Sequence, residues 1–251
     1  MTIRTHNTLK LGDNLIHLNF LRRLAKANPS AEFEHRLNGG YLEKLKPLVS
    51  DLPQIRLAEI TPNMGGSLNC WRGAENYWYE HPLRNDFAAF HVEWFAKLAA
   101  QMGLESPIKC GADMLLDAPC LIPEKLVYNK WDVLLLDSVP TSGQWPQFDF
   151  RGFYWLENEL RGRGLSILRG SSTIAKEWGI ADLGMIAGRC KYVIGTANGP
   201  MWTALNTWAA QTVKQWALFI GNGEVVKLTP NTVCTHDFAE ALACVDASLK
   251  A

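Results

Sequence analysis

The fold of this chain is decided by the stretch Lys191-Tyr192-Val193-Ile194-Gly195-Thr196-Ala197-Asn198-Gly199-Pro200-Met201-Trp202. The apolar run 192–194 predicts a short buried strand, and the small and polar residues 196–200 predict a turn. Pro200 suits the first position of a helix that continues through Met201 and Trp202. A strand that turns directly into a helix leaves backbone N–H groups free at the helix start, which favours an anion such as phosphate. A phosphate site and a plain connector therefore both remain open for this turn.

The composition is that of a globular protein without charge bias. The chain has 251 residues, 47% of them hydrophobic and 20% charged, and its 25 basic side chains balance 25 acidic ones. This length is enough for one large domain or two small ones. A net charge of zero gives no indication of a nucleic-acid groove or of a basic face that would attract a membrane. The ten tryptophans are a mild indication of stacking on sugars or bases.

The six cysteines, at positions 70, 110, 120, 190, 234 and 244, form no Cys-x-x-Cys pair. A chain of this length does not need disulfides, so reduced thiols in a cytosolic protein are expected. The N-terminus has no apolar signal-peptide core, and no run of 18 apolar residues occurs. We therefore expect neither a leader nor a transmembrane segment.

The first 60 residues alternate between strand and helix patterns. A strand-to-helix junction at 9–13 precedes a helix with leucines at helical spacing, which Asn28-Pro29 ends. A strand at 31–37, a short helix at 41–49 and a strand at 54–60 follow. Strand-helix-strand-helix-strand is typical of a parallel sheet with right-handed crossovers.

The stretch 61–84 breaks this alternation and is rich in aromatic residues. Trp71, Tyr77, Trp78 and Tyr79 crowd into an irregular segment. Such a loop is often a binding loop, but the rings could equally cover a gap in a small core, and both interpretations stay open. The next segment, 86–102, has a continuous apolar stripe that predicts a helix. His91 lies in that stripe and is expected to be a core histidine.

The alternation starts again after a proline-rich stretch, so we expect a domain boundary near residue 125. The second half predicts strands at 131–136, 165–168 and 215–220. Helices are predicted at 150–161, 181–190 and, beyond Pro200, through 203–209. The last helix is expected to begin at Asp237, with Glu240 completing a capping box and Leu249 in its apolar stripe.

Several chemistries are excluded by missing motifs. The chain has no Gly-x-x-x-x-Gly-Lys, no Gly-x-Gly-x-x-Gly, no Gly-x-Ser-x-Gly and no His-Glu-x-x-His. It has no Asp-x-Asp, the usual carboxylate pair for a metal-bound nucleotide sugar, and its six histidines lack metal-ligand spacing. We therefore expect neither a metal nor another cofactor. Two strand-to-helix junctions remain, one in each half, and both are expected at an interdomain crevice at the carboxyl ends of the strands.

The order of these motifs resembles the heptosyltransferase-like glycosyltransferases, family nine, of the GT-B fold. The N-terminal match is Leu11-Gly12-Asp13, followed by a helix that ends in Ala27-Asn28-Pro29-Ser30-Ala31-Glu32. The C-terminal match is Trp145-Pro146, Gly164, Val193-Ile194-Gly195 and Gly199-Pro200-Met201. The resemblance implies an α/β fold of two Rossmann-like parallel-sheet halves that face a cleft. Residues 1–125 would form the acceptor side and residues 126–251 the nucleotide-sugar side.

The resemblance also implies an inverting, metal-independent transfer of a sugar from a nucleotide donor to a glycan, a lipid-linked glycan or another hydroxyl acceptor. Asp13 matches the aspartate thought to take the acceptor proton, which is the role an inverting transfer requires of one base. Asp13 is also suited to be the N-cap of its helix. The implied donor-binding residues are Thr196, Asn198, Gly199, Pro200, Met201 and Trp202. Candidates on the acceptor side or for phosphate are Lys10, Gly12, Asn14, Trp71 and Trp78.

The chain departs from the family pattern at three positions and is shorter than typical members. Gly143 stands where the family usually has a lysine, Ala197 where it has an aspartate, and Trp202 where it has a histidine. The lost cation could be supplied by Lys10, Arg151, Arg169 or Lys176.

Two main functional classes are therefore open. The first is a glycosyltransferase, and the second is a GT-B-like protein without transferase activity that binds a nucleotide, a glycan or a protein. An epimerase or hydrolase of nucleotide sugars is a distant third. The resemblance implies a cytoplasmic location, with the inner membrane as a surface to which the protein can be peripheral, and no nucleic-acid partner.

Overall fold

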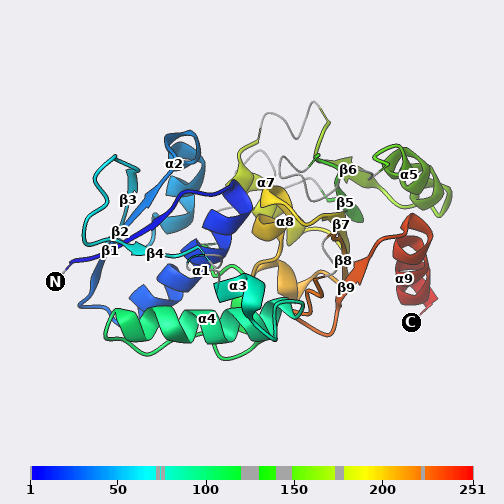
Figure 1. Cartoon of the computed structure of the whole chain (residues 1–251). Coiled ribbons are helices and arrows are strands. Elements are labelled where there is room, and N and C mark those ends of the chain that lie inside the picture. Colours follow the sequence, from blue (N-terminus) through cyan, green and yellow to red (C-terminus); the bar gives the residue numbers. More distant parts are fainter. Residues whose placement is uncertain are drawn as a thin grey trace. The chain divides into compact units, whose positions relative to one another are not determined.

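The computed structural model describes residues 2–71, 74, 77–119, 130–139, 149–172, 178–221 and 224–250. The chain divides into two compact units, Met1–Pro119 and Cys120–Ala251. Each unit has its own parallel sheet, as Figure 1 shows. The predicted α/β fold with two Rossmann-like halves is thereby confirmed. The predicted boundary at residue 125 lies outside the described residues.

The first unit contains a four-stranded sheet in the order β3-β2-β1-β4, with parallel pairing throughout. Its elements are β1 (Thr2–Asn7), α1 (Leu11–Ala27), β2 (Glu32–Leu37), α2 (Gly39–Leu45), β3 (Ile55–Glu59), β4 (Leu68–Asn69), α3 (Tyr77–Glu80) and α4 (Phe87–Gln101). The 3₁₀ helices Lys46–Val49 and Gly111–Met114 complete it. The predicted alternation over the first 60 residues is confirmed. The two-residue strand β4 was missed because two residues are too few to show a period.

The core of the first unit lies between the sheet and the helices α1 and α4. Phe20 of α1 stacks on Phe95 of α4 with the ring centroids 4.4 Å apart. The α4 helix begins where expected, because the Asp86 carboxylate accepts a hydrogen bond from the backbone N–H of Ala89. His91 is buried, and its Nδ1 lies 2.8 Å from the Phe87 carbonyl oxygen. The prediction that His91 is a core histidine is confirmed.

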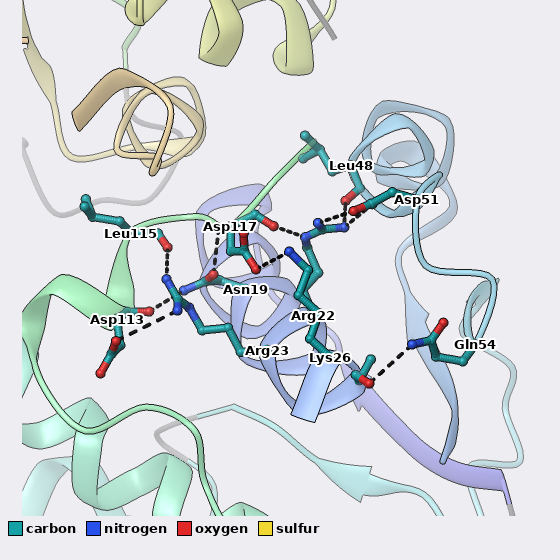
Figure 2. Close-up of polar contacts among 11 residues, drawn as sticks. Asn19, Arg22, Arg23, Lys26, Leu48, Asp51, Gln54, Asp113, Leu115 and Asp117 are labelled. Atoms are coloured by element: carbon teal, nitrogen blue, oxygen red, sulfur yellow. Dashed lines mark hydrogen bonds and ion pairs between the residues drawn. The ribbon is translucent and has the colours of Figure 1, made fainter. Parts of the chain in front are cut away.

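Polar side chains of α1 bind the backbone of neighbouring segments, as Figure 2 shows. The Arg22 side chain is fully buried and binds both carboxylate oxygens of Asp51, at 2.6 and 2.8 Å. It also donates to the backbone carbonyls of Leu48 and Asp117. Asn19 accepts from the N–H of Asp117 and donates to the carbonyl of Asp113, so the segment 113–117 is held to α1 through backbone groups.

The opposite face of this sheet is charged. Arg4, Glu34 and Arg56 are in register across β1, β2 and β3, so their side chains share one face. Glu34 is buried and pairs with both Arg56 and Arg36. A pocket of about 290 Å³ opens at the amino ends of these strands and is lined in part by Arg4, Glu34 and Arg56.

The second unit contains a five-stranded parallel sheet in the order β6-β5-β7-β8-β9. Its elements are β5 (Val133–Leu136), α5 (Gly152–Gly162), β6 (Ile167–Arg169), α7 (Ile180–Ala187), β7 (Tyr192–Thr196), α8 (Gly199–Ala204), the 3₁₀ helix Ala209–Gln211, β8 (Gln215–Phe219), β9 (Thr232–Thr235) and α9 (Phe238–Lys250). The edge strand β9 was not predicted. Its residues, Thr-Val-Cys-Thr, are only partly buried and show no continuous apolar run.

The core of the second unit is apolar on both faces of the sheet. Phe153 of α5 and Val245 of α9 belong to one cluster with Leu135, Ile194 and Phe219 of the strands, which places both helices on the same face. A Cβ atom added to Gly195 would lie 2.6 Å from both the Cβ and the carbonyl oxygen of Leu136. The β5–β7 pairing therefore requires glycine at position 195.

Three details of the second unit differ from the predictions. The helix after Pro200 ends at Ala204 and not at 209, because Asn206 binds the carbonyls of Gly184 and Thr203 and accepts from the N–H of Ala209. Leu249 is 46% exposed and so lies outside the buried stripe of α9. In the predicted capping box, the Glu240 carboxylate would accept a hydrogen bond from the N–H of Asp237. Instead, that N–H donates to Thr235 Oγ1, and the Glu240 carboxylate accepts from the Thr235 hydroxyl.

Candidate functional site

The second unit has a topological switch point between β5 and β7. From β5 the chain moves outward through α5 to β6 and then returns through α7 to β7, on the other side of β5. In open α/β sheets, ligands bind at the carboxyl ends of the strands that flank such a point. Here Asp137 and Ser138 follow β5, and Ala197 and Asn198 follow β7. This edge is the first candidate site.

Asn198 is the hub of this edge. Its Nδ2 lies 2.8 Å from the Ser138 carbonyl oxygen, 2.9 Å from Ser138 Oγ and 2.7 Å from Thr196 Oγ1. The Thr196 hydroxyl is fully buried and also donates to the Ser138 carbonyl, at 2.9 Å. The structure thus brings the predicted residues Thr196 and Asn198 together with Ser138, which the sequence did not single out.

The backbone N–H groups of the turn are largely used within the protein. Ala197 N donates to Phe219 O, Trp202 N to Asn198 O, and Met201 N to Asn198 Oδ1 in a long bond of 3.5 Å. Asn198 is therefore the N-cap of α8, and Pro200 is its second residue, one position later than predicted. The N–H of Gly199 has no hydrogen-bond partner within the described residues. The turn offers one free amide and one weakly held amide to an anion.

The side chains that follow the turn point inward. Met201 is fully buried and Trp202 is 9% exposed. A nearly buried indole offers little surface for a contact with a base or sugar. The donor-binding roles of Met201 and Trp202 remain predictions.

A second polar cluster lies next to this edge, at the ends of β5 and β6. Asp137 is buried and accepts hydrogen bonds from Arg169 Nε at 2.8 Å, from Arg169 Nη2, and from the N–H of Ser171 at 2.9 Å. Arg169 Nη1 also lies 3.2 Å from a Glu157 carboxylate oxygen. Burial acts to lower the pKa of Arg169, but the hydrogen bond and charge of Asp137 outweigh it and raise the pKa. The Arg169 charge is thus balanced by two carboxylates.

The other cations proposed for the donor side are placed as follows. Arg151 is exposed and pairs with Asp149 at 2.9 Å. Lys176 lies outside the described residues, as do Gly143, Trp145 and Pro146. Asp137 and Ser138 could have been found from one signal: a polar pair directly after the continuous apolar run of a predicted strand.

The first unit has the matching strand-to-helix junction at the carboxyl end of β1. Lys10 is the N-cap of α1 and makes no side-chain capping bond, Gly12 is the second helical residue and Asp13 the third. The interpretation of Asp13 as the N-cap is therefore wrong, because the N-cap is Lys10, three residues before Asp13. Asp13 is half-buried in the first turn, where the helix dipole favours its ionised form. The exposed Lys10 side chain makes no ion pair within the described residues.

Buried amides hold this junction from beneath. Asn7 Oδ1 accepts from the N–H of Leu9 at 2.9 Å, and Asn7 Nδ2 lies 2.5 Å from His17 Nδ1. Asn14 Nδ2 donates to the carbonyls of Leu9 and Lys10, at 3.2 and 3.0 Å. Asn14 is fully buried, so its place is under the turn and not on a ligand-facing surface. The sequence indicated neither Asn7 nor His17.

The aromatic segment 61–84 was interpreted either as a binding loop or as a cover for a small core, and its rings differ in this respect. Tyr77 packs on Trp94 with a centroid distance of 5.1 Å, so this ring covers the core. Trp71 and Trp78 are half-buried, and Trp78 Nε1 donates to the Arg84 carbonyl. The acceptor-side roles of Trp71 and Trp78 remain predictions.

Three further properties limit the chemistry of the described part of the chain. Among the described residues, no group of three or more His, Cys, Asp or Glu side chains is placed so that it could hold a metal ion. The same ranges contain no helix with the length and apolar character needed to cross a membrane. The cysteines at 70, 110, 190, 234 and 244 are free thiols, and burial raises the pKa of Cys70 and Cys190 to about 12.

Comparison with known proteins gives a likeness in structure and none in sequence. No protein-family model matches the chain, and no curated protein matches it. E. coli ADP-heptose LPS heptosyltransferase II matches with a TM-score of 0.63 and 11% identity, over 100% of this chain and 99% of that chain. The fold is of the heptosyltransferase type. The predicted resemblance is thereby confirmed at the level of the fold.

Two other solved structures with this fold also match. One is a glycosyl transferase of family 9 from Veillonella parvula DSM 2008, with a TM-score of 0.60, 13% identity and coverage of 99% and 89% of the two chains. The other is the iron-containing dodecameric glycosyltransferase TibC from enterotoxigenic E. coli H10407, with a TM-score of 0.60 and 14% identity. This heptosyltransferase-type chain covers 62% of the length of TibC, with 94% of its own residues aligned.

Proposed function

We propose that this protein is a glycosyltransferase that moves a sugar from a nucleotide-sugar donor to a hydroxyl acceptor, with inversion and without a metal. The observation that carries the proposal is the cluster of Ser138, Thr196 and Asn198 at the switch point of a heptosyltransferase-type unit. All three solved relatives described above are glycosyltransferases by name, and one is named for ADP-heptose.

The donor diphosphate would lie on this cluster. The leaving phosphate gains negative charge in the transition state, so the site must aim hydrogen-bond donors at it. The free N–H of Gly199, the weakly held N–H of Met201 and the Ser138 hydroxyl are such donors. The long bond from Met201 N to Asn198 Oδ1 can be exchanged for a phosphate oxygen at little cost, because it is already weak.

The acceptor proton would be taken by Asp13. A general base must be an ionised carboxylate before the reaction, and the first turn of a helix is a position that favours negative charge. Asp13 lies half-buried at the carboxyl edge of its own sheet, and Asn7 and Asn14 hold the turn that precedes it through the backbone of Leu9. The exposed Lys10 beside it can attract an anionic group of an acceptor, which fits a glycan or a lipid-linked glycan.

A second candidate is a binding protein of the same fold without transferase activity. The balanced charge of Arg169 favours it, because no unpaired cation then stands at the switch point among the described residues of the second unit. In this alternative the switch point binds a nucleotide, and Asp13 has no chemical role. An aqueous cytoplasmic location, with or without attachment to the inner membrane, suits either candidate.

The deciding experiment measures transfer from a panel of ADP-, UDP- and GDP-sugars to glycan acceptors, with the wild type and Asp13→Asn. The variant keeps shape and loses the base, so transfer should fall by about 10²–10⁴-fold. Asp182→Asn is the matched control, because Asp182 is also the third residue of its helix. Thermal melts of both variants check folding.

Unchanged transfer in Asp13→Asn would remove Asp13 from the mechanism. Nucleotide binding by the wild type without any transfer or donor hydrolysis would favour the binding protein. Replacing Gly199 by valine should weaken nucleotide binding in both cases, because the close approach to the phosphate is lost.

A further inference from the structure

Tyr154 is a large aromatic side chain that the fold leaves exposed at the edge of the candidate donor site. It is the third residue of α5, and 61% of its surface is exposed. The α5 helix follows β5 along the chain and, as Figure 1 shows, lies beside β6. The carboxyl end of β6 is Arg169, and the Arg169 guanidinium carbon lies 4.3 Å from the centroid of the Tyr154 ring. One face of the ring is therefore covered by a cation.

The guanidinium beneath this ring is fixed. Asp137 holds Nε and Nη2, and Glu157 holds Nη1. Only 16% of the Arg169 side chain is exposed. A ring that rests on an immobile planar group has already lost much of its freedom, so a ligand that stacks on it pays less ordering entropy.

The charge of the cluster determines which part of a ligand it suits. Asp137 and Glu157 carry two negative charges against the one positive charge of Arg169, and Arg161 also pairs with Glu157. Such a cluster does not attract a phosphate. It presents an aromatic face with no net positive charge, which suits an uncharged planar ring.

The position along the sheet edge matches the dimensions of a nucleotide. β6 and β7 are both paired with β5, on opposite sides. Neighbouring strands lie about 4.8 Å apart, so Arg169 and the turn after β7 are separated by about 10 Å along the edge. A nucleoside diphosphate with its phosphates at Asn198 and Gly199 can reach the end of β6 with its base.

We propose that Tyr154, supported by Arg169, is a stacking platform for the nucleobase of the donor nucleotide. The inference rests on the proposed function for the identity of the ligand, and it adds the residue that holds the base. Base-on-aromatic stacking tolerates any base, because every base has a π face. The platform therefore contributes affinity for the nucleotide and leaves the choice among bases to other contacts.

The test uses free nucleosides, which contain the base but no phosphate or transferable sugar. Adenosine and uridine are titrated into the full chain, and saturation transfer from protein to base protons is measured by NMR. The wild type and Tyr154→Phe should bind alike, since both rings stack. Tyr154→Leu should bind about 5- to 150-fold more weakly, the range found when a stacking aromatic is removed. Trp155→Leu is the control: Trp155 is the next residue on α5, is 43% exposed and has no cation over its ring within the described residues.

Four outcomes would overturn the platform, and a fifth would overturn only the proposed transferase activity. Equal nucleoside binding by the wild type and Tyr154→Leu would place the base elsewhere, and so would a larger loss in Trp155→Leu than in Tyr154→Leu. Saturation transfer to a methyl glycoside but not to the nucleosides would make Tyr154 a sugar platform. Nucleosides that fail to bind while ADP or UDP binds would overturn the platform and leave the donor site standing. Tyr154-dependent nucleoside binding without sugar transfer would keep the platform and refute the transferase.

Discussion

Both units contain a strand-to-helix junction, but different kinds of residues support it in each unit. In the first unit, buried polar side chains such as Asn7, Asn14 and His17 support the turn from beneath, and buried Arg22 fastens a backbone segment to α1. In the second unit β5 is wholly apolar and β7 is apolar up to Gly195, and polar side chains gather at the carboxyl edge around Asn198. Buried polar contacts thus support the junction of the first unit from within the fold, whereas the polar groups at the junction of the second unit lie at the edge where a ligand can bind.

Because the two units differ in this way, we expect them to respond differently to mutation. Removing one partner from a buried polar network leaves an uncompensated group, which costs much more than an exposed pair is worth. An apolar sheet is instead sensitive to volume, because its strands and helices are already in contact. The first unit should therefore fail through lost partners and the second through added atoms.

The largest effect is expected from Arg22→Ala in the first unit. The change leaves the carbonyls of Leu48 and Asp117 without their donor, and each buried group left unpaired costs about 1–3 kcal/mol. Asp51 loses its partner as well, but its side chain is 34% exposed and can turn to water. Because the Arg22 hydrogen bond lowers the pKa of Asp51, that pKa should rise towards its ordinary value in the variant. Hydrogen exchange should show lost protection in the first unit only.

The control for this prediction is Lys26→Ala. Lys26 pairs with Asp117 at 2.6 Å on the same helix, but its side chain is 44% exposed, so its loss should cost no more than about 1 kcal/mol. Equal losses in the two variants would contradict the view that burial makes the Arg22 contacts matter.

The next largest effect is expected from Gly195→Ala in the second unit. The new methyl group would meet the backbone of Leu136, so β5 and β7 must separate, at a cost of about 1–3 kcal/mol. Denaturant unfolding followed by hydrogen exchange should place the loss in the second unit. Gly162→Ala is the matched control, since a Cβ there meets nothing within 4 Å and should stabilise α5 by up to about 1 kcal/mol. A loss in the control as large as in Gly195→Ala would show that the β5–β7 approach is not the cause.

A pH-dependent effect of about 2 kcal/mol is expected from His35 in the first unit. Burial, with a smaller contribution from the charge of His6, lowers the pKa of His35 to about 3. The unfolded chain takes up a proton below about pH 6.5 and the folded chain does not, so stability falls as pH drops from about 6.5 towards 3. At pH 5 the loss is about 2 kcal/mol, at about 1.4 kcal/mol per pH unit.

The variant His35→Asn tests this expectation, because its side-chain oxygen can still accept from Thr5 but does not titrate. Its free energy of unfolding should change less between pH 7.5 and pH 5 than that of the wild type. The same drop in both proteins would assign the acid sensitivity to other groups.

The smallest effect is expected from Arg56→Ala on the charged face of the first sheet. Arg56 is 70% exposed, and its partner Glu34 keeps a second contact with Arg36. The loss should be at most about 1 kcal/mol and should shrink in high salt. Arg36→Ala, which removes the better buried partner, should cost more; the reverse order in urea titrations would show that the exposed pair matters more.

The sequence by itself determined the fold class and the two junctions. Apolar periodicity gave the alternating strands and helices, and residue types alone located the turn after β7 and the junction at 9–13, although α1 begins at Leu11 and not after Asp13. Pattern failed where a tertiary contact replaced a local rule. The helix after Pro200 ends early because Asn206 reaches Gly184, and the two-residue strand β4 exists only because it pairs with β1.

What only the tertiary structure decided is the partner of each polar group. Asn198 forms a hydrogen bond with Ser138, 60 positions away in the sequence, and Arg169 forms one with Asp137, 32 positions away. These pairings turn Arg169 from a candidate phosphate ligand into the support of Tyr154, and they place Ser138 at the switch point. Short-range periodicity reports only which face a residue occupies, whereas hydrogen bonds and charge balance depend on strands brought together by the sheet. The sequence therefore determined where the candidate site lies, and the folded chain decided which atoms remain available to a ligand.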